Sequence, residues 1–203
     1  MVSSVMLPLP FTRKPPRMPE EHSRLGTSLL ILARDAISER FGIACRPFAD
    51  LPELHTPVAT FVTLMKRGAL RGCIGTLSAY RALLDDVRAN ACAAAFSDPR
   101  FAPVDVGELP DITVEVSVLT APTPLSFHDE ADALAQLRPN IDGVILRVRH
   151  YRATFLPQVW EQLPDTHSFM AHLKQKAGLP ADYWSPEVVL ERYQVEKWKE
   201  TSA

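Results

Sequence analysis

The amino-acid sequence predicts an α+β fold with a mainly antiparallel sheet and flanking helices. Along the chain we expect a helix, a hairpin, a second helix, a strand, a short helix, a second hairpin, further helices and a last strand. Helices and strands do not alternate regularly, as they would in a fold built from parallel βαβ units. With 203 residues, of which 46% are hydrophobic and 23% charged, the chain is long enough for one well-packed globular domain.

The N-terminal part of the chain divides into a tail and a helix. Residues 1–22 are rich in proline, with basic residues among the prolines, and predict a disordered tail ahead of a domain that spans 23–199. From Ser23 onward, leucines, alanines and isoleucines recur at helical spacing and Gly42 follows as a stop. This pattern predicts a well-buried helix.

The stretch Leu70–Leu77, with the sequence LRGCIGTL, is the most informative in the chain. It follows a run rich in β-branched residues over 58–65 and a turn over 66–69, which predicts a hairpin. In a strand, side chains alternate between faces, so Arg71, Cys73 and Gly75 share one face. Glycines inside a strand mark a bulge or a close approach to the backbone, which favours a functional site.

The remaining elements follow from periodicity and turn residues. Helices are expected over 80–95, 129–137 and 165–177, and strands over 112–120, 144–148, 152–156 and 188–196. Asp98 lies in a turn-rich break, where we interpret it as a turn cap rather than as a partner of Arg100. Glu115 lies at the centre of a polar strand face. It is either solvated or, if that face lines a cleft, a base or an ion partner of Arg71.

Charge and cysteine usage exclude several classes of protein. The formal net charge is −2, so no global field attracts nucleic acid or an acidic membrane. No segment has the roughly 18–20 apolar residues that cross a bilayer. Cys45, Cys73 and Cys92 have no CxxC spacing, which argues against a disulfide framework or a zinc site and fits a reducing compartment. We expect a cytoplasmic protein without metal or cofactor.

Other polar residues have two interpretations. Arg147, Arg149 and Arg152 give the second predicted hairpin a basic face. We favour a solvated face with a few ion pairs, and the alternative is a phosphate or carboxylate site, because the planar guanidinium suits both anions. His167 and His172 do not have the i, i+4 spacing of a zinc-binding pair, so we interpret them as surface histidines.

Several segments together resemble one family. They are Leu70–Thr76, Ala95–Phe101, Glu115–Leu119, Asp142–Leu146, Thr154–Trp160, Lys176–Leu179 and Trp184. In order and spacing they are similar to the AMME-syndrome chromosomal-region protein family, whose bacterial and archaeal members are called AmmeMemoRadiSam system protein A. The resemblance spans about Ser23 to Lys199, and nothing departs from the signature in a way that suggests an inactive copy.

The resemblance implies more about fold than about chemistry. It implies two unequal lobes with a groove between them and the RGCIG segment near the site. Members of the family have no settled activity, and the name implies an association with a radical-SAM protein and a Memo-type, dioxygenase-like protein. As candidate binding residues we take Arg71, Gly72, Gly75, Thr76, Glu115 and Gln158.

Two hypotheses of function remain open at this stage. In the first, the protein is a binding module whose groove receives a small molecule, a peptide or a small anion, with Arg71 binding a carboxylate or phosphate, and RNA is the less expected ligand. In the second, Cys73 is a nucleophile whose thiolate Arg71 stabilises, while amides beside Gly72 and Gly75 hold an oxyanion. The sequence assigns no general base, and His150, His167 and Glu115 are only candidates for that role. Against the enzyme, an unpaired cysteine is often a small core residue.

Overall fold

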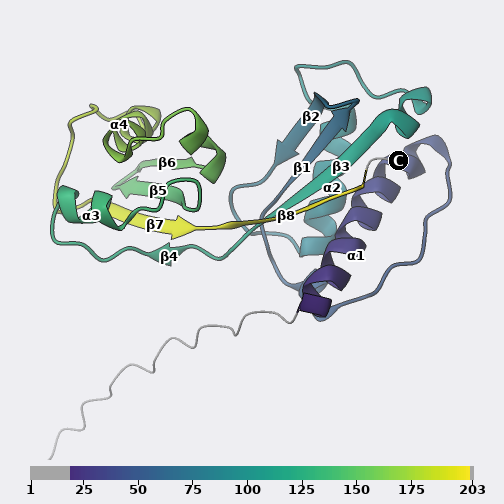
Figure 1. Cartoon of the computed structure of the whole chain (residues 1–203), viewed down its shortest axis with the longest axis horizontal. Helices are drawn as coiled ribbons and strands as arrows, with labels where there is room; N and C mark the ends of the chain where they lie inside the picture. Colours follow the sequence, from purple (N-terminus) through teal and green to yellow (C-terminus); the bar gives the residue numbers. More distant parts are fainter. Residues whose placement is uncertain (1–18, 202–203) are drawn as a thin grey trace, which may run out of the picture.

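The protein has two lobes, each built on a four-stranded antiparallel sheet (Figure 1). A computed structural model describes residues 19–201, so most of the predicted tail lies outside the described residues. The strand orders are β2-β1-β3-β8 in the larger lobe and β4-β7-β5-β6 in the smaller lobe. The predicted α+β class with antiparallel sheets and flanking helices is confirmed.

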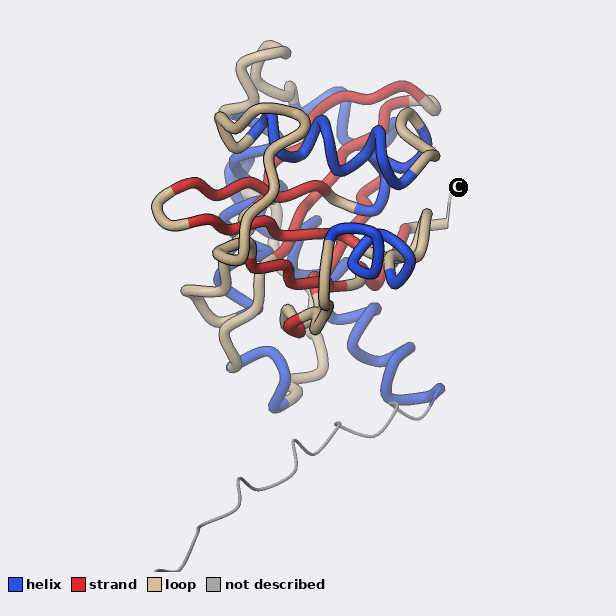
Figure 2. Tube along the Cα trace, turned by 90° about the vertical axis from the view of Figure 1, so that its left-hand side faces the viewer, coloured by secondary structure: helices blue, strands red, loops and turns tan. Residues whose placement is uncertain are grey.

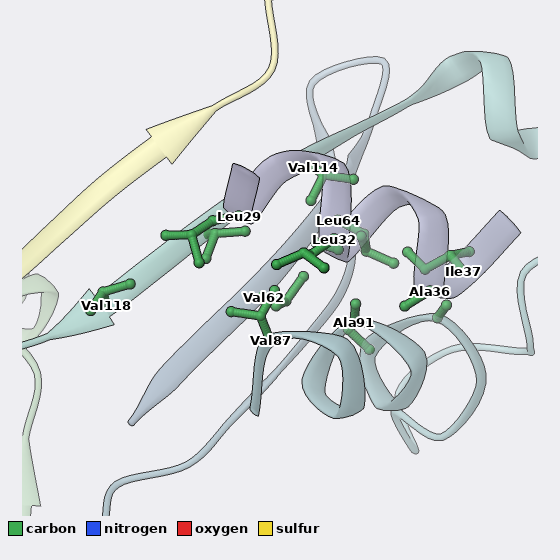
Figure 3. Close-up of a cluster of buried hydrophobic side chains, with 14 of the residues drawn as sticks. Leu29, Leu32, Ala36, Ile37, Val62, Leu64, Val87, Ala91, Val114 and Val118 are labelled. Atoms are coloured by element: carbon green, nitrogen blue, oxygen red, sulfur yellow. The ribbon is translucent and has the colours of Figure 1, made fainter. Parts of the chain in front are cut away.

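The larger lobe contains both ends of the described chain. Its elements are α1 (Pro19–Ser38), η1 (Glu39–Phe41), η2 (Pro52–His55), β1 (Thr60–Lys66), β2 (Ala69–Gly75), α2 (Leu83–Phe96), η3 (Val106–Asp111), β3 (Ile112–Leu119) and β8 (Val195–Lys199). Apolar residues of α1 meet those of β1 in its core, where Leu32 and Ile37 lie close to Leu64 (Figure 3). Helix α1 begins before the predicted Ser23, and Gly42 follows η1 with a φ of 75°.

The smaller lobe is one continuous segment inserted between β3 and β8. Its elements are β4 (Thr123–Pro124), α3 (Glu130–Gln136), β5 (Gly143–Val148), β6 (Tyr151–Phe155), η4 (Pro157–Glu161), α4 (Thr166–Lys176) and β7 (Val189–Tyr193). Its core includes a stacked pair of rings, Trp160 on Phe169, with centroids 3.6 Å apart. Figure 2 turns the smaller lobe toward the viewer, so that its strands lie in front of the larger lobe.

The last strand predicted from the sequence is in fact two strands in two different sheets. Residues 188–196 were expected to form one strand, but β7 ends at Tyr193 in the smaller lobe and β8 begins at Val195 in the larger one. Between them, Gln194 accepts a hydrogen bond from the Thr120 amide (2.9 Å) and its own amide donates to Thr120 Oγ1 (2.8 Å). Side-chain alternation continues through Gln194, so the sequence shows no break there.

The two glycines of the RGCIG strand are required by packing. A Cβ on Gly72 would lie 2.2 Å from the carbonyl oxygen of Ala94 on α2, because strand and helix backbones approach closely there. A Cβ on Gly75 would lie 2.3 Å from the ring of Phe61 on β1. Close approach to the backbone was predicted, and the groups that approach are a helix and an aromatic ring of the same chain.

We predict that Gly72→Ala lowers the free energy of unfolding by about 1–3 kcal/mol, because the added methyl group must separate β2 from α2. Urea unfolding followed by circular dichroism measures the change. Gly107→Ala is the matched control, since its Cβ would meet nothing nearer than Asp105 Oδ1 at 3.3 Å. Equal stability of Gly72→Ala and the wild type would contradict this explanation of the glycine.

Candidate functional site

The two sheets meet through the faces that their helices leave uncovered. In the larger lobe, α1 and α2 pack on one face, and the other face carries Phe61 and Leu119. In the smaller lobe, α3 and α4 cover one face, and Ile145 and Tyr193 lie on the other. These four residues belong to one apolar cluster, the junction cluster, completed by Ala59, Leu156 and Val195. The functional residues predicted from the sequence are best located relative to this cluster.

Tyr193 fixes the smaller lobe's side of the junction. Its ring lies against Gly143, where a Cβ would come within 2.4 Å of it. Its hydroxyl lies 3.0 Å from Thr154 Oγ1 and donates to the Phe155 carbonyl oxygen at 3.1 Å. Burial raises the pKa of the Tyr193 hydroxyl, so it remains a neutral donor. The buried hydroxyls of Tyr193 and Thr154 are therefore hydrogen-bonded beside an otherwise apolar junction.

A polar row lies next to the junction cluster on the uncovered face of the larger sheet. Cys73, Thr63 and Glu115 are register partners on β2, β1 and β3. Thr63 Oγ1 lies 3.3 Å from Cys73 Sγ, and Glu115 Oε1 lies 3.8 Å from Lys197 Nζ. The half-buried thiol is thus on a sheet face, outside the apolar core, and the ion partner of Glu115 is Lys197 rather than Arg71.

Arg71 is committed to another carboxylate. Its Nε and Nη2 donate to the two oxygens of Glu108 at 3.1 and 2.8 Å, and Lys66 Nζ donates to the same carboxylate at 2.8 Å. Arg71 first and Lys66 second hold the pKa of Glu108 well below its usual range. Arg71 Nε and Nη2 therefore form a bidentate ion pair with the Glu108 carboxylate. The sequence hypothesis that Arg71 stabilises a Cys73 thiolate has no geometric support here.

The free edge of β2 is covered by two side chains from the loop after α2. β2 is an edge strand, and the Cys73 amide, which points away from β1, donates to Asp98 Oδ2 at 2.9 Å. Arg100 Nη2 donates to the Cys73 carbonyl oxygen at 3.2 Å, and Arg100 Nε donates to Asp98 Oδ1 at 2.9 Å. Asp98 Oδ1 also accepts from the Arg100 amide at 3.1 Å, so the predicted turn cap is confirmed, and the alternative pairing of Asp98 with the Arg100 side chain is present as well. Such cover prevents another strand from pairing at this edge.

Thr76 belongs to a buried network that sequence reasoning missed. Asp86 Oδ2 accepts from the hydroxyls of Thr76 and Thr60, each at 2.7 Å, and from Asn90 Nδ2 at 2.9 Å. Asp86 Oδ1 accepts from Arg81 Nη2 at 2.8 Å. The available signal was the i, i+4 pair of Asp86 and Asn90, two polar residues on the inner side of a helix that is otherwise lined with apolar residues.

The Asp86 network holds the loop over residues 76–82 at both ends. Thr76 at its start and Arg81 near its end bind the same carboxylate. Between them, Leu77 and Tyr80 are 43% and 65% exposed, large fractions for apolar side chains. The loop is therefore fixed at its base and presents apolar side chains to solvent.

The smaller lobe contributes Arg152 and Gln158 to the same region. Arg152 Nη1 donates a long hydrogen bond of 3.5 Å to Ser78 Oγ, which links β6 to the loop after the RGCIG strand. Gln158 lies in η4, which begins directly after Leu156 of the junction cluster. Its Oε1 atom is buried and has no hydrogen-bond partner among the described residues. An unpaired buried acceptor is costly, so this oxygen is a candidate contact for a donor from outside the chain.

Two surface hollows lie elsewhere on the larger lobe. One, of about 520 Å³, is lined by α1, the start of β3 and the end of β8, and includes Arg34 and Glu200, which pair with each other. The other, of about 310 Å³, lies between α1 and residues 47–49. Neither hollow is lined by a candidate catalytic or binding residue of the sequence analysis.

The fold and the position of the RGCIG segment define a two-lobed α+β protein, and comparisons with known proteins identify its class. The AMMECR1 family model matches residues 30–198, so the chain belongs to the AMMECR1 family. A protein of Methanothermobacter thermautotrophicus is 41% identical over 180 residues, which cover 86% of this chain and 94% of that protein. A protein of Sulfolobus acidocaldarius is 39% identical over 176 residues, with coverages of 81% and 76%.

A solved structure agrees with this assignment. The crystal structure of the uncharacterized protein PH0010 from Pyrococcus horikoshii superposes with a TM-score of 0.70 at 33% sequence identity. The match covers 90% of this chain and 93% of that one. Within residues 19–201, no helix combines the length and apolar character that a membrane crossing requires.

We predict that the Asp98 cap makes stability depend on pH. Arg100 first and the Cys73 amide second hold the pKa of Asp98 well below its usual value of 3.8. The ionised cap therefore stabilises the fold above the unfolded-state pKa, and this contribution is lost as the pH falls below it. As the pH falls from about 7 to about 3, the free energy of unfolding should decrease less in Asp98→Asn than in the wild type.

Urea unfolding at both pH values measures this difference, with Asp182→Asn at an exposed site as control. An unchanged pH dependence in Asp98→Asn would refute the role of the cap.

Proposed function

We propose that the protein is a binding module whose ligand, a small molecule or a short peptide, lies where the RGCIG strand and its following loop approach the smaller lobe. The observation that carries the proposal is the meeting of the two uncovered sheet faces at the junction cluster. Ligands bind preferentially between lobes, where two rigid walls supply apolar contacts and a few polar groups.

Groups suited to ligand recognition surround the junction. The larger lobe supplies Thr63 and Glu115 on one wall, and the fixed loop supplies Ser78. The backbone of Gly75 also contributes. Cys73 and Gly75 are two residues apart in an antiparallel ladder, so the Gly75 amide, like that of Cys73, points away from β1.

The alternative, an enzyme with Cys73 as nucleophile, has weaker support. Its favourable observation is the half-buried thiol beside the Thr63 hydroxyl on an uncovered sheet face. A threonine hydroxyl is no general base, and the guanidinium expected to activate the thiol is paired with Glu108. His150 packs on Tyr151 in the turn between β5 and β6, with ring centroids 4.1 Å apart. A binding role needs none of these groups to be catalytic.

We also propose that the protein acts with a radical-SAM protein and a Memo-type, dioxygenase-like protein. The support is the resemblance of the sequence to a family associated with both. We take the exposed Leu77 and Tyr80, three residues apart on the fixed loop, as the contacts for a protein partner. Size-exclusion chromatography of the purified proteins, alone and mixed, tests the proposal. Co-elution that Tyr80→Ser abolishes would support it, and separate elution of all three proteins would refute it.

We predict that a library of small neutral and charged fragments, screened by ¹⁵N–¹H NMR, contains members that shift the amides of residues 75–81. Because the thiol serves packing in a binding module, Cys73→Ser should change the dissociation constant of such a fragment by less than about threefold, less than 1 kcal/mol. Ser78→Ala, which removes a hydroxyl at the ligand, should weaken the binding of hydrogen-bonding fragments more than Cys73→Ser does.

Two results would contradict the binding module. In the first, no fragment shifts residues 75–81 while fragments shift residues that line the hollows along α1. In the second, iodoacetamide labels Cys73 much faster than Cys45 and Cys92, with a midpoint well below the free-cysteine pKa of about 8.5, which is the signature of an activated nucleophile. Cys45 and Cys92 serve as internal references, since a hydrogen bond to Glu39 raises the pKa of Cys45 and burial raises that of Cys92.

A further inference from the structure

We infer that the ligand carries an oxyanion, a carboxylate or a phosphate, and that Arg152 of the smaller lobe binds it. The inference rests on the proposed binding site and names the class of ligand for it. Its starting point is the pair formed by Arg147 on β5 and Arg152 on β6, which are direct register partners on the uncovered face of the smaller sheet. Like charges directly opposite each other in a sheet are destabilising.

The two arginines differ in how their charge is compensated. Arg147 Nη2 lies 3.0 Å from Glu191 Oε1 on the neighbouring strand β7. Arg149, the third arginine of this hairpin, pairs with Glu187 at 2.7 Å. Arg152 is exposed and has no carboxylate partner within the part of the chain that the structure describes. In the basic face predicted from the sequence, Arg147 and Arg149 are therefore paired with carboxylates of the described chain, and Arg152 is not.

The surroundings of Arg152 fit an oxyanion. Its face continues into the junction cluster through Thr154, which is the next residue on that side of β6 and the register partner of Ile145. Its own contact across the lobes is the long 3.5 Å bond to Ser78 Oγ, a hydroxyl that can donate to an anion. A guanidinium presents parallel N–H donors that match the two oxygens of a carboxylate or phosphate. An oxyanion between Arg152 and Ser78 would replace one long hydrogen bond with charge-assisted ones.

The test uses inorganic phosphate and acetate as probes on the whole chain. Each is titrated against chloride at constant ionic strength, while NMR follows the Arg152 Nε–Hε signal and the Ser78 amide. We expect a saturable shift of both signals with at least one of the two anions, and the stronger one indicates which oxyanion the ligand carries. Arg152→Gln should weaken that binding about tenfold or more, because the charged donors are lost.

The control is Arg149→Gln, which removes the same charge from the same hairpin at a paired arginine and should leave the affinity unchanged. Three results would overturn the inference: no saturable shift in the wild type, equal binding by Arg152→Gln, or equal losses in both variants, which would indicate attraction to the overall charge. Both positions are exposed, so thermal unfolding verifies that the variants fold.

The proposed binding module can survive failure of this test. A neutral fragment that shifts residues 75–81 equally in the wild type and in Arg152→Gln, without any saturable response to phosphate or acetate, would remove the oxyanion and retain the binding site. Failure of anions and fragments alike to shift these residues would reject both.

Discussion

The structure depends on one constraint, the closure of the junction between the two lobes. The chain crosses from the larger lobe to the smaller one after β3 and returns at Gln194, and the paired hydrogen bonds of Thr120 and Gln194 hold the two crossings together. The junction cluster then buries apolar residues from both sheets. Because each sheet already has helices on one face, only the uncovered faces can meet. A polar group at Phe61 or Ile145 would therefore separate the lobes, and the candidate site would lose one of its walls.

The RGCIG strand ends at this junction and is protected there. As an edge strand it exposes backbone groups, and Asp98 with Arg100 occupies those of Cys73 as a neighbouring strand would. One step further along the chain, Asp86 fixes the loop over 76–82. These two carboxylate anchors place the end of the strand and its loop in a defined position relative to the smaller lobe. Under the proposed function, the residues conspicuous in the sequence therefore position the candidate site rather than react in it.

The sequence predicted most helices and strands correctly, but it did not predict which side chains pair with one another. Helical spacing and strand alternation are local signals, so the hairpin around Gly68 and the helix of Leu29 and Leu32 were expected correctly. The pairing of Arg71 with Glu108, 37 residues apart, and that of Thr60 with Asp86, 26 residues apart, depend on contacts between distant segments of the chain, which no local pattern encodes. The division of the last strand at Gln194 was missed for the same reason. Arg147, Arg149 and Arg152 were recognised as a basic face, but only the positions of Glu187 and Glu191 show which arginine is left without an acid.

The location of the ligand between the lobes is the central claim, and crystals soaked in isopropanol and in acetate test it most directly. Small organic probes collect at sites that combine apolar walls with a few polar groups, which is the character of ligand sites. Our account predicts ordered probe molecules between the loop over 76–82 and the face that carries Arg152, with acetate on the guanidinium. Probes found only in the two hollows along α1, with none at the junction, would contradict it.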